Sequence, residues 1–294
     1  MEPYNRAAVR LLFFGTPQFA VPALDAVARE HEVVLVVAQP DKPAGRGMRV
    51  QAPAVVARAR ELGLAVAQPA KIRDFVPPAA DAAVVVAYGK ILPASLLAAM
   101  PFYNVHASLL PKYRGAAPIQ RAIERGETET GVTIMRVDAE LDHGPMLLAA
   151  RTPIGPDEHA PALGSRLSAL GAALLLRALR ERPAEVEQDH ARATLAPKIE
   201  KEEGLVRWSE PARAIYDKFR AFDPWPGVFT ASMKLIDIAP ASGDGAPGAV
   251  IAIDDGVVVA CGEGALRVRT IQRAGKPRVN AADVARAERW RVVP

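Results

Sequence analysis

Two hydrophobic periods alternate along the first two-thirds of the 294-residue chain. Short apolar runs, typical of buried strands, alternate with segments in which apolar side chains recur every three to four residues, as on one face of a helix. We expect strands at 9–15, 32–38, 81–87, 103–107, 130–138 and 144–154, and helices at 17–30, 54–63, 117–126 and about 158–181. Strands that are separated by helices predict an α/β fold, with a Rossmann-like, mostly parallel sheet covered on both faces.

Functional residues of such sheets lie at the carboxyl ends of the strands. Three short segments fall at these ends: Gly15–Thr16–Pro17, Tyr88–Gly89 and His106–Ala107–Ser108. We therefore expect the three segments to converge on one edge of the sheet.

The pattern changes near residue 183, where a charged stretch without clear periodicity runs to about 204. A short helix is expected next, at 211–222. Four short apolar runs broken by Gly, Pro and Asp then occupy 233–239, 248–254, 256–262 and 265–272, which is typical of a small β-barrel or sandwich. The predicted limits are 1–188 for the α/β domain, 189–204 for a linker and 205–294 for the second domain.

Composition excludes several classes of protein. The single cysteine, Cys261, cannot form an internal disulfide, and no Cys/His cluster has the spacing of metal ligands. The first apolar run is broken by Gly15 and Pro17, so it is no secretory signal, and no run of eighteen apolar residues predicts a membrane span. We expect a cytoplasmic protein without a bound metal. The net charge of +4 allows a nucleic-acid partner if the cations cluster.

The segment "NVHASLLPKYRGAAPIQRAI" carries the most distinctive chemistry of the chain. Asn104 and His106 are two residues apart on a strand, so they point to the same face. An amide donor beside an imidazole suits a carbonyl oxygen that becomes negative during a reaction. A third group is needed to orient His106 and favour its charged form. Asp138, Glu140 and Asp142 are the candidates, and spacing alone does not choose among them.

Structural roles compete with each of these assignments. An Asn or His at a strand end is more often a turn residue than a catalyst, and Asp142 before Gly144 fits simple turn chemistry. Ser108 invites a Ser/His/Asp hydrolase, but the chain has no G-x-S-x-G and this Ser follows the His by two residues. The segment "FFGTPQFA" lacks G-x-G-x-x-G, so NAD binding has little support.

Taken in chain order, several segments resemble the methionyl-tRNA formyltransferase family. They are "FFGTPQFAVPAL", "QPDKPAGRG", "VVVAYGKILP", "NVHASLLPKYRGAAPIQRAI", "TGVTIMRVDAELDHGPML" and "RAFDPWPGVFT". The Asn-x-His-x-Ser-Leu-Leu-Pro segment with its distant Asp is similar to that of all 10-formyltetrahydrofolate-using transferases of this superfamily. The continuation "RGAAPIQRAI", the "PAGRG" loop and the "PWPG" segment narrow the resemblance to the tRNA enzymes.

The resemblance implies transfer of a formyl group from 10-formyltetrahydrofolate, a consumed cosubstrate, to the α-amino group of methionine on initiator methionyl-tRNA, without a metal. It implies that Asn104 and protonated His106 stabilise the tetrahedral oxyanion, while Asp142 keeps His106 charged and placed. It also implies a folate-contacting loop, formed by Ser108, Leu109, Leu110 and Pro111.

Contacts with tRNA are implied in two places. The loop "DKPAGRGMRV" would meet the acceptor stem through Lys42, Arg46 and Arg49. The second domain is expected to be an OB-like β-barrel that holds the tRNA, since residues 265–291 carry eight Lys or Arg and two acids. An ordinary solvated loop and a solubilising charged face are the respective alternatives. The expected state is a monomer.

The chain departs from the family beside Asp142. The family pattern is expected to read "LDTGD", whereas this chain has "LDHGP", so His143 and Pro145 are unusual. Three other functions remain open: a formyltransferase acting on a small amine such as a glycinamide ribonucleotide or an amino sugar, a nucleic-acid-binding module on a catalytically dead α/β domain, and a hydrolase that releases formate.

Overall fold

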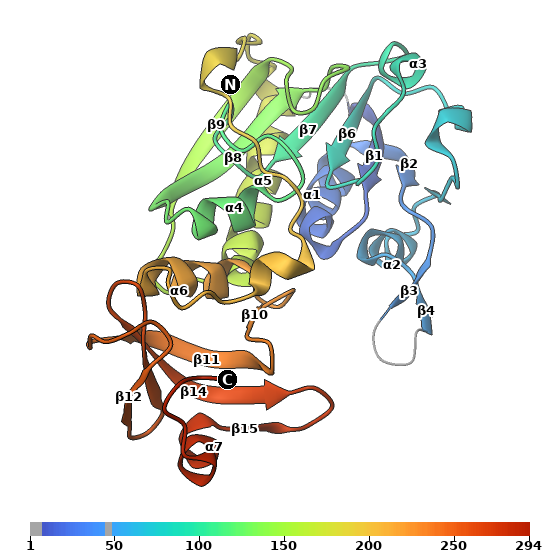
Figure 1. Cartoon of the computed structure of the whole chain (residues 1–294). Helices are drawn as coiled ribbons and strands as arrows, with labels where there is room; N and C mark the ends of the chain where they lie inside the picture. The colour runs from blue at the N-terminus through green and yellow to red at the C-terminus, as the bar shows by residue number, and fades with distance from the viewer. Residues whose placement is uncertain (1–7, 45–48) are drawn as a thin grey trace. The chain divides into compact units, whose positions relative to one another are not determined.

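The computed structural model describes residues 8–44 and 49–294. The chain forms two compact units (Figure 1). Unit 1 comprises Met1–Pro118, Glu129–Pro153 and Gly164–Pro197, and unit 2 comprises Ile119–Thr128, Ile154–Leu163 and Lys198–Pro294. The predicted domain limits stay a prediction. Two short segments from the first two-thirds of the chain, Ile119–Thr128 and Ile154–Leu163, belong with the C-terminal unit.

A seven-stranded mixed sheet forms the centre of unit 1, in the order β5-β2-β1-β6-β7-β8-β9 (Figure 1). Its strands are β1 (Arg10–Gly15), β2 (Glu32–Val37), β5 (Val66–Ala67), β6 (Ala82–Val86), β7 (Phe102–His106), β8 (Glu129–Arg136) and β9 (Met146–Pro153). The strands from β5 to β7 are parallel, and β8 and β9 are antiparallel additions. The predicted Rossmann-like, mostly parallel sheet is therefore confirmed.

The apolar run of β1 is buried at every residue after Arg10 because the strand lies in the middle of the sheet, covered on both faces. Leu11, Leu12, Phe13 and Phe14 are fully buried. Phe14 meets Tyr88 edge to face, with ring centroids 5.4 Å apart, which ties the carboxyl end of β1 to that of β6.

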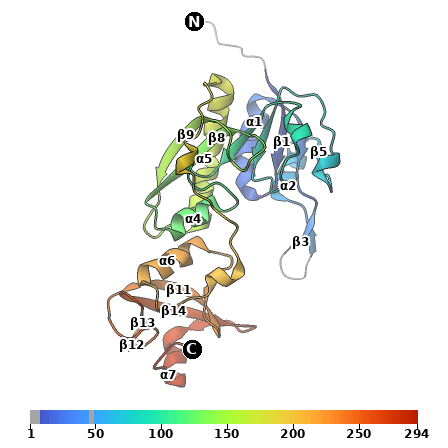
Figure 2. The same ribbon diagram turned by 45° about the horizontal axis from the view of Figure 1, so that its top comes forward.

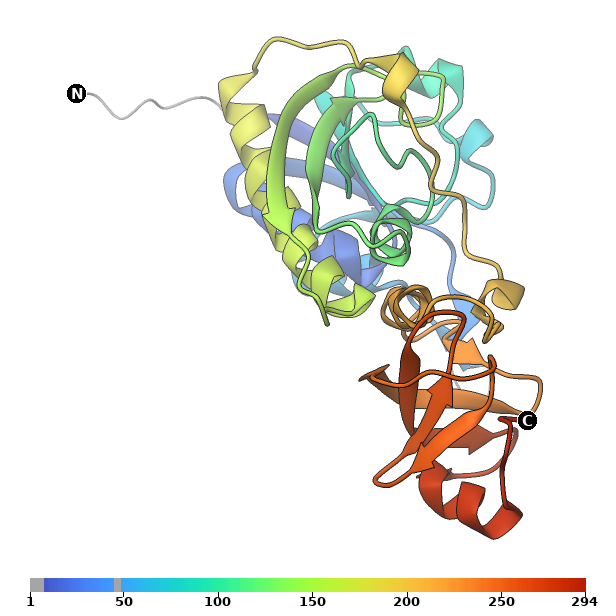
Figure 3. The ribbon, with the colours of Figure 1, turned by 60° about the vertical axis from the view of Figure 1, so that its left-hand side comes forward.

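Helices α1 (Val21–Glu30), α2 (Ala54–Glu61), α4 (Pro118–Glu124) and α5 (Ala160–Glu181) were expected from the sequence. The long helix α5 packs on the sheet (Figure 3). At Gly171, a Cβ atom would stand 2.6 Å from Val105 Cγ1 of β7. Among the described residues, α5 alone is long and apolar enough to span a membrane by length and composition. Half of its most apolar window is buried, as in the core helix of a domain.

Unit 2 is built on an antiparallel sheet in the order β10-β11-β14-β13-β12, with β15 paired to β14 (Figure 2). Its elements are α6 (Ala212–Ala221), β10 (Val228–Phe229), β11 (Met233–Ala241), β12 (Val250–Ile253), β13 (Val257–Ala260), β14 (Ala265–Arg273), β15 (Arg278–Asn280) and α7 (Ala281–Glu288). Ile215 of α6 is buried among sheet residues such as Leu235 and Leu266. An antiparallel C-terminal sheet is confirmed, whereas a closed OB-like barrel stays a prediction.

The hydrophobic pattern missed several short elements. Two of them, β3 (Lys42–Ala44) and β4 (Arg49–Gln51), form a hairpin inside the segment expected to be a loop. The pattern also missed α3 (Ala94–Leu97) and α7, whose N-terminus is capped by Asn280 Oδ1 accepting from the Ala282 and Asp283 amides. These elements are too short or too rich in alanine for an apolar period to stand out.

Candidate active site

The carboxyl ends of the parallel strands meet at one edge, as predicted. Thr16 Oγ1, just after β1, donates to the Tyr88 carbonyl after β6 at 3.0 Å. Strand β7 ends at His106, so its last residues reach the same edge. Asn104 and His106 of β7 both face the Asp142 carboxylate.

Of the three candidate acids, Asp142 is the one that lies beside Asn104 and His106. Asn104 Nδ2 donates to Asp142 Oδ1 at 3.2 Å, and the Gly115 amide donates to Oδ2 at 2.8 Å. His106 Nδ1 lies 3.6 Å from the same Oδ2, too long for a good hydrogen bond but close enough for an ion pair. Asp138 is instead bonded to His143, and Glu140 is exposed.

The tautomer of His106 follows from its surroundings. Its Nε2 lies 2.8 Å from the Tyr113 carbonyl oxygen. A carbonyl oxygen can only accept, so Nε2 carries a hydrogen and donates. Nδ1 is then the ring nitrogen left to gain or lose a proton, and it is the one that faces Asp142. The ring is only 5 % exposed, which shields this arrangement from bulk water.

Unusual backbone conformations gather at this edge. Ala87, Tyr113 and Asp142 have φ values of 47°, 62° and 49°, in the left-handed region that non-glycine residues rarely adopt. Such conformations persist only where surrounding contacts hold them, and they concentrate at functional sites. Gly144 is required for a different reason, since a Cβ atom there would stand 2.2 Å from the Arg136 carbonyl oxygen.

The loop from Ser108 to Pro111 is pinned from β8. Thr133 Oγ1 donates to the Ser108 carbonyl at 2.7 Å and accepts from the Leu110 amide at 3.1 Å. Ser108 is fully buried and its hydroxyl donates to the Lys112 carbonyl, so it shapes the loop and does not contact the imidazole as a hydrolase nucleophile would. Leu109 and Pro111 are half-buried.

Residues that pattern reasoning missed lie in a strap, residues 186–197, which crosses unit 1. Val186 pairs with Met146 of β9, and the Thr194 carbonyl and Ala196 amide bond to the backbone of Arg114 at 2.8 and 2.7 Å. Gln188 and Arg114 are both buried and bonded to each other. A buried glutamine in a charged, aperiodic stretch leaves no periodic signal.

The residues proposed for the tRNA loop are described only in part. Lys42 lies exposed in β3 and Arg49 belongs to β4, whereas Arg46 lies outside the described residues.

The cations of unit 2 are more neutralised than their number suggests. Arg267 pairs with Asp254 and Asp255, Arg269 with Asp255 at 3.3 Å, and Arg273 with Glu288 at 2.7 Å. Asp254 and Asp255 lie outside residues 265–291, in the turn between β12 and β13. Within the described part of the chain, no ion pair engages Lys276, Arg278, Arg289 or Arg291.

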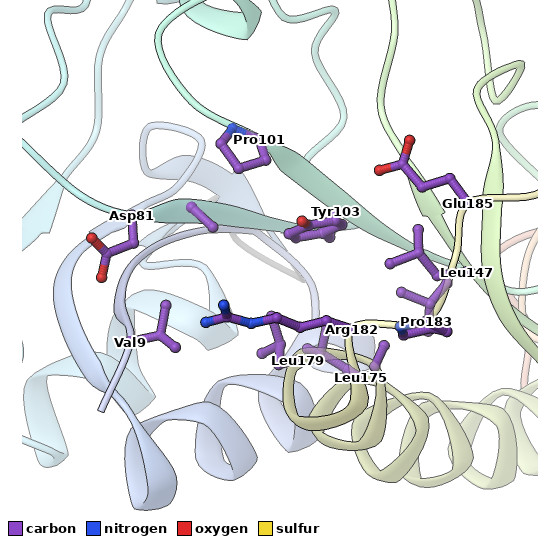
Figure 4. A pocket seen from close by; sticks show the side chains of 13 residues that line it. Val9, Asp81, Pro101, Tyr103, Leu147, Leu175, Leu179, Arg182, Pro183 and Glu185 are labelled. Carbon is purple, nitrogen blue, oxygen red and sulfur yellow. The ribbon is translucent and has the colours of Figure 1, made fainter. Parts of the chain in front are cut away.

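A buried thiol and a cavity are further features with potential chemistry. Burial raises the pKa of the Cys261 thiol to about 11, so it stays protonated near neutral pH, in keeping with a structural role. A cavity of about 420 Å³ lies at the opposite, amino edge of the sheet (Figure 4). Nine of its thirteen lining residues are apolar, and Asp81, Tyr103, Arg182 and Glu185 are the polar ones. In residues 8–44 and 49–294, no His, Cys, Asp and Glu side chains group as a metal site.

Comparison with known proteins identifies the class first. Residues 9–179 match the family model described as formyl transferase, and residues 198–289 match that of the formyl transferase C-terminal domain. Solved structures share the fold at low sequence identity. An N-formyltransferase from Helicobacter canadensis, in complex with folinic acid and dTDP-3-aminofucose, has a TM-score of 0.68 at 16% identity, over 90% of this chain and 99% of that one.

Full-length relatives are more specific. The methionyl-tRNA formyltransferase of Thermus thermophilus is 46% identical over 95% of this chain and 96% of its own. That of Deinococcus radiodurans is 48% identical over 92% of this chain and 90% of its own. The chain therefore belongs to the methionyl-tRNA formyltransferase family, as the sequence motifs predicted.

Proposed function

We propose that the protein transfers the formyl group of 10-formyltetrahydrofolate to the α-amino group of methionine on initiator methionyl-tRNA, for translation initiation. The observation that carries the proposal is the cluster of Asn104, Asp142 and the buried His106 at the carboxyl edge of the sheet. Membership of the family supports the choice of substrates.

Asn104 and His106 are the proposed donors to the formyl oxygen as it becomes negative. One hydrogen of Asn104 Nδ2 is used by Asp142, which leaves the second for a substrate. A protonated His106 offers Nδ1–H, because Nε2–H is already held by the Tyr113 carbonyl. Donors fixed in advance in a site shielded from water stabilise a developing charge strongly.

The Asp142 carboxylate is proposed to stabilise the positive charge of protonated His106. Its Oδ2 also accepts from the Gly115 amide, so the carboxylate keeps its place whether or not His106 is protonated. The attacking amine must lose a proton, and because both ring nitrogens of a protonated His106 carry hydrogens, the Asp142 carboxylate is the proposed acceptor.

The folate supplies the activated formyl group, and the loop from Ser108 to Pro111 is the proposed place for its ring system. The half-buried side chains of Leu109 and Pro111 offer apolar surface to a flat ring beside His106, which fits such a group. Ser108 and Leu110 are buried and hold the loop in shape. They are therefore proposed to act through the backbone.

The proposal includes tRNA contacts by Lys42, Arg46 and Arg49 and by the unpaired cations of unit 2. Electrostatic contact with phosphates needs such cations and weakens as salt rises. A cytoplasmic, monomeric enzyme without membrane attachment completes the proposal, and light scattering of the purified protein measures the oligomeric state.

A side-by-side transfer assay with 10-formyltetrahydrofolate tests this function. The acceptors are methionine-charged initiator tRNA, methionine-charged elongator tRNA and glycinamide ribonucleotide. We expect formylation of the initiator alone. Formylation of the small amine alone would keep the chemistry of the cluster and overturn the tRNA substrate. Release of formate without any acceptor would indicate a hydrolase.

A further inference from the structure

We infer that Gln188 and Arg114 are positioning residues that hold the Asp142 carboxylate in place through the backbone of the turn 142–144. The kinetic consequence rests on the proposed function, whereas the structural consequence does not depend on any substrate. Gln188 lies outside the sequence motifs that suggested the catalytic cluster, and Arg114 lies within one of them but has no role assigned from the sequence.

Gln188 bridges the two carbonyls on either side of His143. Its Nε2 donates to the Asp142 oxygen at 2.9 Å and to the Gly144 oxygen at 2.7 Å, so both amide hydrogens are used. The side chain comes from the strap and is only 4 % exposed. Water cannot easily replace it, and its loss would leave two carbonyls without these donors.

Arg114 decides which way the Gln188 amide points. Its guanidinium donates to Gln188 Oε1 from NH2 at 2.7 Å and from Nε at 3.2 Å. A guanidinium has only donors, so the Gln188 amide oxygen must face Arg114 and the Gln188 amide nitrogen must face the turn. Arg114 is 8 % exposed, and its own backbone is bonded to the strap. The two side chains and the turn therefore form one connected unit.

The turn needs this support because Asp142 has a φ of 49°. A non-glycine residue relaxes out of the left-handed region unless its surroundings hold it there. Rotation of this one residue would carry its carboxylate away from Asn104, His106 and the Gly115 amide together. The Gln188 hydrogen bonds hold the backbone of the turn, while the contacts of the carboxylate hold the Asp142 side chain.

A pair of stacked imidazoles joins the same unit and accounts for His143, where the chain departs from the expected family pattern. The rings of His143 and His190 lie parallel, with centroids 4.0 Å apart. His190 Nδ1 lies 2.8 Å from Arg114 NH2, so it accepts and is unprotonated. His143 Nδ1 lies 2.7 Å from Asp138 Oδ2. The stack thus ties the turn to the strap a second time.

The variant Gln188→Glu tests the inference. It keeps the size of the side chain and an acceptor for Arg114, but it turns oxygen atoms toward two carbonyl oxygens. The matched control is Glu187→Gln, the reverse change at the exposed neighbouring position. We expect kcat to fall about 100-fold in Gln188→Glu, the cost of a misplacement of about 1 Å, with the KM of both substrates nearly unchanged. The control should keep wild-type kinetics.

Hydrogen exchange of the Gly115 amide gives a readout without any substrate, because this amide donates to Asp142 Oδ2. Exchange should be at least several-fold faster in Gln188→Glu and unchanged in Glu187→Gln. A second variant, Arg114→Lys, frees the Gln188 amide to turn and should have the same effect to a smaller extent. Unchanged Gly115 exchange in both Gln188→Glu and Arg114→Lys would overturn the inference. A wild-type protein that fails to formylate methionyl-tRNA would overturn the proposed function alone, since the exchange experiment still decides this inference.

Discussion

Charged groups are arranged differently at the carboxyl edge of the unit 1 sheet and on the β14 face of unit 2, which carries Arg267, Arg269 and Arg273. At the edge, His106 and Asp142 are nearly buried, and each atom of their polar groups has an assigned neighbour. On β14, the arginines are partly exposed and pair with acids from adjacent strands and turns. Few charges therefore do specific chemistry in the first region, while many charges partly cancel in the second.

Burial explains why the two regions respond differently to the loss of a charged group. In a buried site the position of every atom matters, because water cannot compensate a displaced group. On an exposed sheet, ion pairs contribute little and are screened by salt. A count of cations along the sequence therefore overstates the positive field of unit 2.

The largest expected effect is at the carboxyl edge. Asn104→Ala removes a proposed donor to the developing negative oxygen, and kcat should fall about 10²- to 10³-fold. His106→Ala should cost at least as much. Tyr103→Phe, on the opposite face of β7, is the control and should keep wild-type turnover. Single-turnover formylation measures the effect, and activity near wild type in Asn104→Ala would remove its assigned role.

A buried ion pair in unit 2 should be as sensitive to the loss of one partner as the groups at the carboxyl edge, unlike the exposed ion pairs of β14. Asp217 pairs with Arg220, which is 1 % exposed. Asp217→Ala leaves that cation buried without its carboxylate and should lower the free energy of unfolding of unit 2 by about 3–5 kcal/mol.

Urea unfolding followed by tryptophan fluorescence measures this change in unit 2 selectively, since the three tryptophans, Trp208, Trp225 and Trp290, all belong to it. Asp283→Ala, which removes the partner of the exposed Arg286, is the control and should barely move the midpoint. Equal shifts in the two variants would contradict the contrast between buried and exposed pairs.

The smallest effect is expected among the exposed cations. Lys276→Ala and Arg278→Ala should each weaken tRNA binding and lower the salt slope of the affinity by about one, as for a lost phosphate contact. Arg273→Ala should matter less because Glu288 already offsets its charge. Filter binding of tRNA across a salt series compares the three, and a larger loss for Arg273→Ala would reverse our reading of the β14 face.

Much of unit 1 could be predicted because its signals are local. The apolar run of β1 reports a strand covered on both faces, and the positions of Asn104 and His106 at the end of β7 follow from the period of a strand. The family motifs lie in the same segments. Residue spacing narrowed the acid partner of His106 to three candidates but did not choose Asp142, because a strand or helix period does not describe the turn that contains it.

Local sequence patterns predicted the order of the main elements, the class of fold and the shared face of Asn104 and His106 on β7, since each depends on neighbours within a few residues. Spacing left Asp138, Glu140 and Asp142 open, and the family resemblance implied Asp142. The packed fold alone brought Gln188 from the strap to the Asp142 turn and placed Asp254 and Asp255 against Arg267. These choices join residues that are distant along the chain. They depend on which backbone segments the packed core brings together, and this is information that no local pattern carries.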